Sequence, residues 1–339
     1  MIAMALSLAT GRKLIAEHVF IRCPVILVCF EDGKDELRRR VTAAIQHHGI
    51  SKEDIQGYLF IAAVSRVDAK LAANRNGEMT AGKLGAALER SITRRKAGAV
   101  FLDPFVKTHS VGENDNIAID FVVEILSELA IRLDFGMCSP HHTRKGPSDP
   151  GNADTGRGAG SLKDAFRLCY TLAPMSKDEA DTYAVNPDER VSLIRLDSAK
   201  VNLVRRSAQA RWFRLVGIAI GNASALYPQG DEVQTVECWI PPDTFAQLTT
   251  VTINAILDRL EAGPYEGGRY SSSSNAKDRA PWPLVKELCP SLNEKQAKSI
   301  IATWIKNGVL EKRGHKDPKD SHDHPSLFVI KRPGSTWEA

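Results

Sequence analysis

The sequence predicts an α/β protein in which a mostly parallel sheet is covered by helices on both faces and is followed by a small C-terminal module. Three observations support this fold class. Short, unbroken apolar runs, which are typical of strands buried on both sides, alternate along the chain with helix-like segments. Several runs end in polar or charged residues, as residues 99–105 (AVFLDPF) do at Asp103. Residues 277–335 have a different pattern, which predicts the separate module.

The elements of the first half follow one another in alternating order. Residues 1–10 are apolar and helix-forming, and Gly11 ends this helix in the manner of a C-cap glycine. Residues 24–30 (PVILVCF) form a buried strand that ends in Glu31 and Asp32, and a charged helix follows. We then expect a strand, a polar loop and a helix that leads to the strand ending at Asp103, at 58–64, 66–80 and 83–96.

The second half of the main domain continues this order. Its best amphipathic helix has four large apolar residues on one stripe, Ile117, Phe121, Ile125 and Leu129. The strand predicted at 135–139 ends in Pro140-His141-His142, and residues 146–160 are expected to form a mobile loop over the sheet edge. Further strands of the same sheet are predicted at 167–172, 191–196 and 212–220.

Length, composition and charge exclude several classes of protein. The 339 residues are enough for two or three domains, and 43% hydrophobic content is ordinary for a globular protein. No apolar stretch is long enough to span a bilayer, and the first residues lack a secretory signal, so we expect a cytoplasmic protein without membrane contact. The six cysteines include no C-x-x-C pair, so their spacing predicts neither a zinc site nor a disulfide framework. A net charge of +4 permits nucleic-acid binding without requiring it.

The C-terminal part divides into a connection and a module. We expect a core domain at 1–235, a connection at 236–276 with a helix from about 244 and a flexible Ser/Gly-rich linker at 263–275, and a module at 277–335. In the module, helices at 283–288 and 294–307 surround a turn, and strands at 309–312 and 327–331 can pair as a hairpin. This order describes a winged-helix domain.

The basic residues of this module are candidates for contact with DNA: Lys295, Lys298, Lys306, Lys312 and Arg313. They show no base-reading pattern, and many winged helices bind only protein, so both interpretations stay open. The module also contains three histidines among Asp and Lys residues, His315, His322 and His324. We predict that they lie in a flexible, solvent-exposed loop of the hairpin and do not form a metal site.

Asp103 allows two interpretations from its own surroundings. A carboxylate at a strand end can hold the water shell of a nucleotide-bound Mg²⁺, or it can begin a turn with Pro104. A phosphate loop has the pattern G-x-x-x-x-G-K-[ST], and residues 77–84 come near it. Leu84 replaces the Ser or Thr that would bind Mg²⁺, and no apolar strand precedes this stretch. We therefore predict that residues 77–84 do not cradle phosphate.

Six stretches in a fixed order resemble the RecA-like, RepA-type hexameric ATPases of plasmids, phages and prophages. They are CFED at 29–32, LDPF at 102–105, ENDN at 113–116, HHTRKG at 141–146, the segment from Arg157-Gly158 to Arg167, and Lys200-x-Asn202 followed by Arg211-Trp212-Phe213. The resemblance extends to about residue 225. It implies a RecA-like P-loop NTPase core, ATP and Mg²⁺ as cofactors, assembly into a homo-oligomeric ring, most simply a hexamer, and action on DNA.

The resemblance also implies site roles. Glu31 matches the catalytic glutamate, Asp103 the Walker-B acid that holds Mg²⁺ through water, His142 the sensor histidine, and Arg167 the arginine finger that reaches a neighbouring subunit. Asp32, Arg157 and Lys200 are secondary candidates for contact with the nucleotide. The structural alternatives are an acid at a helix N-terminus for Glu31, a rim feature for the His pair, and an ion pair with Asp164 for Arg167.

The resemblance lacks one part, because residues 1–10 match the helix that follows the phosphate loop. We expect that loop and its strand to lie upstream of residue 1, in a reading frame assigned from an internal methionine, in preference to a decayed gene. The leading function is an ATP-hydrolysing motor, helicase-type or replication-initiation ATPase of a mobile element. The alternative is a non-enzymatic DNA-binding regulator that uses the winged helix. A third interpretation is a metal hydrolase built on Asp103, His141 and His142.

Overall fold

The computed structural model describes residues 1–333 except 65–68, 76–77, 159, 203–206, 208, 244, 246–247 and 274–275. Two compact units make up the chain. The first unit contains Met1–Pro174 and Ser192–Ile240, and the second contains Met175–Val191 and Pro241–Ala339. The boundaries expected from the sequence, at 235 and 276, stay predictions.

A four-stranded parallel sheet forms the centre of the first unit. Its strands are β1 (Val25–Cys29), β2 (Leu59–Ala63), β5 (Ala99–Asp103) and β6 (Gly136–Cys138), in the order β2-β1-β5-β6. In the pairing of β1 with β5, Cys29 lies beside Asp103. In the pairing of β5 with β6, Phe101 lies beside Cys138. Because all four strands are parallel, their carboxyl ends meet at one edge, as the sequence predicted.

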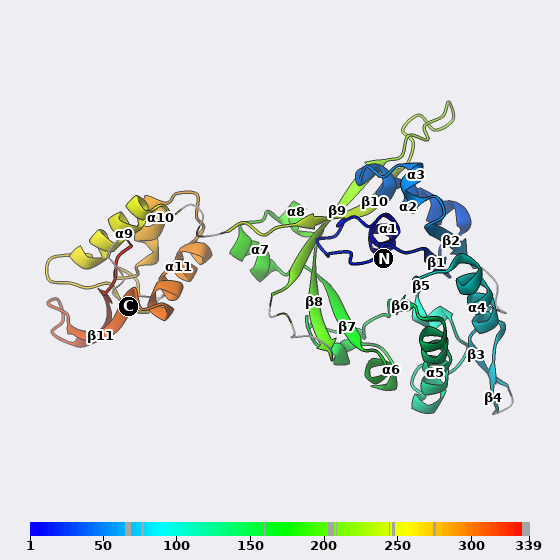
Figure 1. Ribbon diagram of the computed structural model, residues 1–339. Coiled ribbons are helices and arrows are strands. Elements are labelled where there is room, and N and C mark those ends of the chain that lie inside the picture. The colour runs from blue at the N-terminus through cyan, green and yellow to red at the C-terminus, as the bar shows by residue number, and fades with distance from the viewer. Residues whose placement is uncertain are drawn as a thin grey trace. The chain divides into compact units, whose positions relative to one another are not determined.

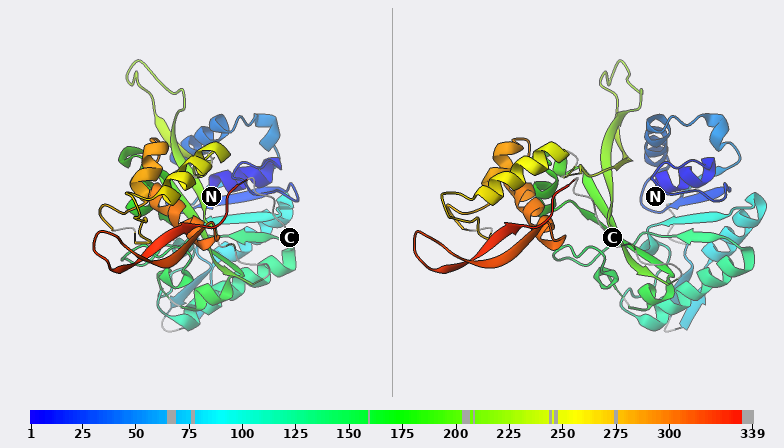
Figure 2. Two further views of the ribbon diagram at one scale, coloured as in Figure 1. Left: turned by 90° about the vertical axis from the view of Figure 1, so that its left-hand side faces the viewer. Right: turned by 60° about the vertical axis from the view of Figure 1, so that its left-hand side comes forward.

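Helices cover both faces of this sheet (Figures 1 and 2). On one face, α1 (Ile2–Thr10) and α2 (Lys34–His47) pack on Val25, Leu27 and Phe101. On the other face, α4 (Lys83–Arg95) and α5 (Asn116–Leu133) pack on Val100 and Leu102. Alternate residues of each strand point to opposite faces, and both sets here are apolar. The predicted helix–sheet–helix arrangement is confirmed.

Local sequence signals fix where these helices begin and end. Gly11 has a φ of 74° and donates its N–H to the Ser7 carbonyl, which ends α1 as predicted. Asp115 begins α5, because its side chain accepts hydrogen bonds from the N–H groups of Ile117 and Ala118, both at 3.1 Å. A short helix, α3 (Lys52–Ile55), is capped by Ser51 in the same way.

The strands after residue 167 do not join the parallel sheet, so that prediction is wrong. They are β7 (Leu168–Pro174), β8 (Leu193–Val201), β9 (Arg211–Ala219) and β10 (Glu232–Trp239), and they form a second, wholly antiparallel sheet. Consecutive strands of this sheet are hydrogen-bonded neighbours and run in opposite directions, as in an antiparallel meander. The sequence signal for β10 was missed, and α6 (Gly160–Ala165) precedes β7.

The predicted polar loop at 66–80 contains a small hairpin of β3 (Ala72–Arg75) and β4 (Glu78–Ala81). Gly82 follows β4 and donates its N–H to the Leu71 carbonyl at 2.7 Å, and Leu84 donates to the Lys70 carbonyl at 3.0 Å. These N–H groups are therefore occupied within the fold. The described part of the G-x-x-x-x-G-K stretch is thus part of a hairpin-to-helix turn, which agrees with the prediction that it does not cradle phosphate; Gly77 lies outside the described residues.

The second unit is built around three helices and a hairpin. The helices α9 (Thr250–Ala262), α10 (Trp282–Leu288) and α11 (Glu294–Lys306) enclose an apolar core together with β11 (Leu310–Lys316) and β12 (Asp323–Val329). Two short helices, α7 (Lys177–Tyr183) and α8 (Pro187–Arg190), also belong to this unit. The remaining regular elements of the described chain are the 3-10 turns η1 (Phe105–Lys107) and η2 (Ala153–Thr155) of the first unit.

The described part of the Ser/Gly-rich segment is folded against the hairpin, which differs from the flexible linker expected. Tyr270 accepts the Leu327 N–H at 2.9 Å, and Ser271 pairs with Ser326. The Tyr265 hydroxyl donates to the buried Asp317 carboxylate at 2.5 Å, and Arg279 pairs with the same carboxylate at 2.8 Å. Small residues allow this close packing, and their composition alone cannot distinguish it from a linker.

Among the described residues, no helix combines the length and the apolar character needed to cross a membrane.

The backbone approach at Gly82 gives a test of the fold. A Cβ at this position would lie 2.1 Å from the Lys70 carbonyl oxygen, whereas a Cβ at Gly85, in the helix α4 that follows, would meet Ile125 at an ordinary 3.5 Å. We expect Gly82→Ala to lower the free energy of unfolding by more than about 2 kcal/mol. Gly85→Ala should change it little or raise it by up to about 1 kcal/mol. Urea unfolding measures both, and equal effects of the two variants would contradict the described turn.

Candidate functional site

Acidic side chains gather where the parallel strands end. Asp103 is the last residue of β5, and Glu31 and Asp32 follow β1, its neighbour in the sheet. The Phe30 N–H donates to the Asp103 carbonyl at 2.8 Å, which extends the pairing of the two strands beyond Cys29. The three acids predicted from sequence therefore lie together at the carboxyl edge of the sheet.

Two cations offset part of this negative charge. Arg40, on α2, forms an ion pair with Asp32, and Lys107, in η1, approaches Glu31 with a separation of 4.0 Å between Nζ and Oε1. The Asp103 carboxylate carries no hydrogen bond within the described part of the chain. Arg40 and Lys107 were not predicted as site residues, since neither belongs to a recognisable motif.

Burial is the main cause of a raised pKa at Asp103, and the neighbouring carboxylates of Glu31 and Asp32 raise it further. The Met1 amino group and Arg40 act in the opposite direction without cancelling the effect. A half-buried carboxylate beside two others favours a bound cation, because the cation relieves both the desolvation and the repulsion.

The beginning of α1 lies close to these acids. The Met1 amino group is near enough to Asp103 and Cys138 to lower the pKa of both groups. The first N–H groups of a helix have no partners inside the helix, and its dipole is positive at this end. The edge therefore combines acids from β1 and β5 with the anion-attracting end of a helix.

The segment after β6 is fixed beside β5 by backbone and side-chain hydrogen bonds. The Ser139 hydroxyl donates to the Leu102 carbonyl at 2.5 Å, and the Phe105 N–H donates to the Pro140 carbonyl at 3.0 Å. His142 is exposed, while His141 is half-buried and packs against the Phe105 ring. His142 thus follows the third adjacent strand at the same edge of the sheet as Asp103.

Arg157 and residues 113–116 (ENDN) form ion pairs and hydrogen bonds with other parts of the fold. Arg157 pairs with Glu113 at 2.9 Å, and its N–H donates to the His142 carbonyl at 2.9 Å. Asp115 caps α5, and Asn116 accepts the Ser161 N–H at 3.3 Å. These contacts connect the ENDN run to the segment 142–161, so Arg157 holds the His142 loop in place.

Lys200 forms hydrogen bonds within the fold, whereas Arg167 forms no ion pair with any described residue. Lys200 donates to the carbonyls of Lys163 and Asp164, at 3.0 and 2.9 Å, and so holds the C-terminal end of α6. Arg167 is exposed just before β7 and forms no ion pair among the described residues. The alternative pairing of Arg167 with Asp164 is not found, since Asp164 lies 3.9 Å from Lys163 instead.

The predicted basic residues of the second unit are partly engaged. Lys295 donates to the Asp178 carbonyl at 2.7 Å, Lys298 pairs with Glu294 at 2.7 Å, and Arg313 pairs with Glu311 at 2.6 Å. Lys306 and Lys312 form no ion pair with any described residue.

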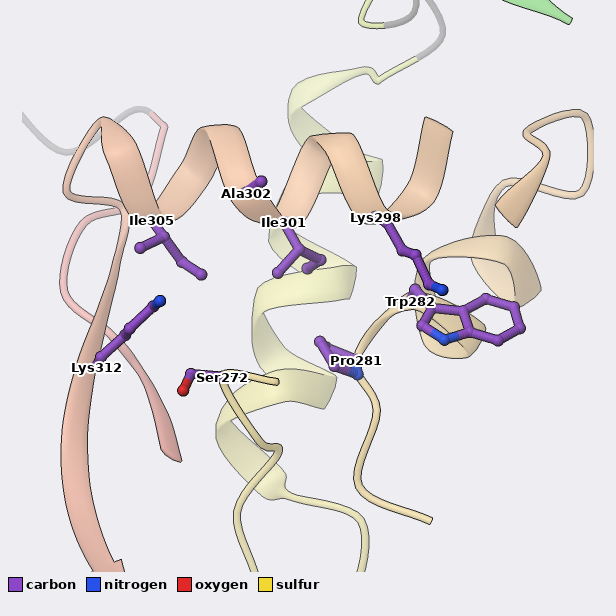
Figure 3. A pocket seen from close by; sticks show the side chains of 8 residues that line it. All are labelled: Ser272, Pro281, Trp282, Lys298, Ile301, Ala302, Ile305 and Lys312. Atoms are coloured by element: carbon purple, nitrogen blue, oxygen red, sulfur yellow. The ribbon is translucent and has the colours of Figure 1, made fainter. Parts of the chain in front are cut away.

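A groove of about 250 Å³ lies between α11 and β11. Figure 3 shows Lys298 and Trp282 at one end and Lys312 at the other, with Ile301, Ala302 and Ile305 along α11 between them. Its lining is apolar along the helix and basic at the ends. The lining residues contain no carboxylate.

The histidines of the hairpin have separate partners. His315 contacts the Gly267 carbonyl at 2.9 Å, and His324 contacts Asp320 at 2.7 Å. Throughout the described residues, no three or more His, Cys, Asp or Glu side chains are placed to share a metal ion.

The raised pKa of Asp103 predicts a pH-dependent effect on stability. At neutral pH the fold holds this carboxylate charged in a place that favours the neutral form, so Asp103→Asn should raise the melting temperature by a few degrees. As pH falls through the raised pKa towards the ordinary value of 3.8, native Asp103 takes up its proton and the difference should shrink. Asp120→Asn, on the exposed face of α5, is the control. A melting temperature that falls in Asp103→Asn at pH 7 would contradict the described surroundings.

Residues 1–148 match the family of AAA domains. No curated protein matches the sequence. The matched part contains β1, β5 and β6 with Glu31, Asp32, Asp103 and His142, and it ends before Arg157, Arg167 and Lys200. The AAA match and the parallel α/β core together fit an ATPase of the P-loop type.

Proposed function

We propose that this chain is the core of a cytoplasmic, RepA-type ATPase of a mobile genetic element, which acts on DNA as a ring. The observation that supports an ATPase best is the edge of the parallel sheet. There Asp103 is the last residue of β5, Glu31 comes after the paired strand β1, and the start of α1 lies beside them. An AAA domain provides nucleotide and Mg²⁺ chemistry of the kind such an edge can hold.

The residues at this edge fit Mg²⁺ held through water. Asp103 is half-buried, and its carboxylate has no hydrogen-bond partner among the described residues and lies near two further carboxylates. Mg²⁺ prefers one or two carboxylates and keeps most of its water, which agrees with a single strand-end acid. When bound with ATP, Mg²⁺ neutralises charge that develops on the transferred phosphoryl group.

Each side chain has a distinct role in this proposal. Glu31 accepts a hydrogen bond from the attacking water and orients it, a role suited to an exposed carboxylate one strand away from Asp103. His142 reports the state of the γ-phosphate by hydrogen bonding from the neighbouring strand end.

Asp32 pairs with Arg40 and keeps that guanidinium near the edge. Arg157 supports the His142 loop, and Lys200 supports the segment that leads to Arg167.

Nucleotide affinity depends on a phosphate cradle. Within the 339 residues no stretch has the full pattern G-x-x-x-x-G-K-[ST]. The N–H groups of Gly82 and Leu84 are used by the fold, so that near match offers no cradle. We propose that the triphosphate lies at the start of α1, because this helix end is close to Asp103 and its N–H groups and dipole attract anions.

Assembly with further copies is supported by the surface around Arg167. Three apolar residues of β7, Leu168, Tyr170 and Leu172, are exposed at alternate positions, so they share one face of this edge strand. An exposed arginine beside an exposed apolar strip suits a subunit boundary, where the guanidinium completes a neighbour's site. Lys306 and Lys312 of the second unit are available for DNA phosphates, as a winged-helix role requires.

Glu31→Gln tests the enzymatic part of the proposal. The protein should be expressed from the longest reading frame that contains these residues, and hydrolysis of ATP should be measured with and without DNA. We expect kcat to fall by about 10²–10⁴-fold, with binding of a fluorescent ATP analogue changed by less than about threefold. The control is Glu36→Gln, on the surface of α2, which should retain full activity.

Full hydrolysis by Glu31→Gln would overturn the role of that residue. The alternative, a DNA-binding regulator without enzymatic activity, would be favoured by a wild-type protein that binds DNA and functions in cells without hydrolysing ATP.

Mixing two inactive variants tests the shared site. Arg167→Ala and Glu31→Gln should each lack hydrolysis, but a mixture should regain part of the wild-type rate if Arg167 acts on a neighbouring subunit. In that case some sites in the mixture combine an intact Glu31 with an intact Arg167. Sedimentation should show assembly of both variants. A mixture that stays inactive although it co-assembles would show that Arg167 does not complete a neighbour's site.

A further inference from the structure

One buried aromatic side chain contacts all three segments that bear the proposed site residues. Phe105 is two residues after Asp103, is only 1% exposed, and belongs to η1. Its ring centroid lies 5.1 Å from that of His109, 6.0 Å from that of His141 and 6.4 Å from that of Phe166. His141 immediately precedes His142, and Phe166 immediately precedes Arg167. The ring is therefore in contact with the neighbours of two candidate residues, while its backbone continues from the third.

The backbone of Phe105 strengthens this connection. Its N–H donates to the Pro140 carbonyl at 3.0 Å, so the loop after Asp103 and the loop before His142 share a hydrogen bond as well as a ring contact. The rings of His141 and Phe166 meet Phe105 at 81° and 84°, which are edge-to-face arrangements with specific directions. A movement of one loop must therefore shift the others or break these contacts.

The two histidines in this cluster are held by packing. His109 is 5% exposed, and burial is the main cause of its lowered pKa. Its Nδ1 accepts the Val111 N–H at 3.4 Å, while His141 uses Nε2 toward the Arg157 carbonyl. The other nitrogen of each ring is buried and has no hydrogen-bond partner among the described residues. The rings therefore depend on Phe105 for their positions more than a fully hydrogen-bonded histidine would.

We propose that Phe105 is a positioning residue that couples Asp103, His142 and Arg167, so that a change at one of them is transmitted to the other two. This inference rests on the proposed ATPase function. Phe105 does not contact the reacting atoms. It keeps the His142 loop and the start of β7 in one arrangement relative to the end of β5, and Lys200 holds the opposite side of the same segment through the end of α6.

Phe105→Leu removes the edge-to-face contacts and keeps an apolar side chain. The matched control is Phe135→Leu, because Phe135 is buried in the same apolar cluster but precedes β6, at the opposite end of that strand. The first measurement is hydrogen–deuterium exchange of the full chain without nucleotide. We expect Phe105→Leu to raise exchange in residues 139–143 and in 166–168 by about tenfold or more, and Phe135→Leu to leave both segments unchanged.

The second measurement is steady-state hydrolysis by the same proteins. Phe105→Leu should lower kcat by about tenfold or more and leave the KM for ATP within about twofold, since it misplaces groups needed only during reaction. Unchanged exchange in either segment would overturn the coupling, whatever the enzymatic activity. Raised exchange with an unchanged kcat, in a wild-type protein that hydrolyses ATP, would overturn the positioning role. A wild-type protein without hydrolysis contradicts the proposed function, and the exchange data still decide the coupling.

Discussion

The parallel register between β1 and β5 is the constraint on which the candidate site depends. Pairing of Cys29 with Asp103 places the residue that ends one strand beside the acids that follow the other, and pairing of Phe101 with Cys138 adds the His142 loop. A shift of one residue would turn Asp103 to the opposite face of the sheet. The register is fixed because alternate residues of both strands are buried against different helices.

The acids at this edge reduce the free energy of unfolding. Burial and neighbouring carboxylates raise the pKa of Asp103, and its carboxylate accepts no hydrogen bond from the described residues that would stabilise the charge. Such an arrangement reduces stability and suits a cation-binding role. Arg40, Lys107 and the start of α1 supply positive charge nearby, each from a different element: α2, η1 and α1.

Several predictions of local structure succeeded because their causes are local. The strands at 25–29 and 99–103 are unbroken apolar runs, and the end of α1 follows from one glycine. The antiparallel sheet was missed because alternating burial in β7–β10 does not reveal the direction of pairing, which depends on the connections. The packed segment around Tyr265 and Ser271 was read as a linker because its polar residues find their partners in the hairpin, about fifty residues away.

The sequence by itself determined the parallel core, its covering helices, and the acids Glu31, Asp32 and Asp103 at strand ends, because apolar periodicity and the polar residues that interrupt it are properties of neighbouring residues. Only the tertiary structure decided which candidates are engaged: Lys200 holds α6, Arg157 pairs with Glu113, and Arg167 stays exposed. It also revealed Phe105 between the loops of His141 and Phe166. The residues in these contacts are tens of positions apart in the sequence. Their interaction energies depend on distance in space, which the sequence around each residue does not reveal.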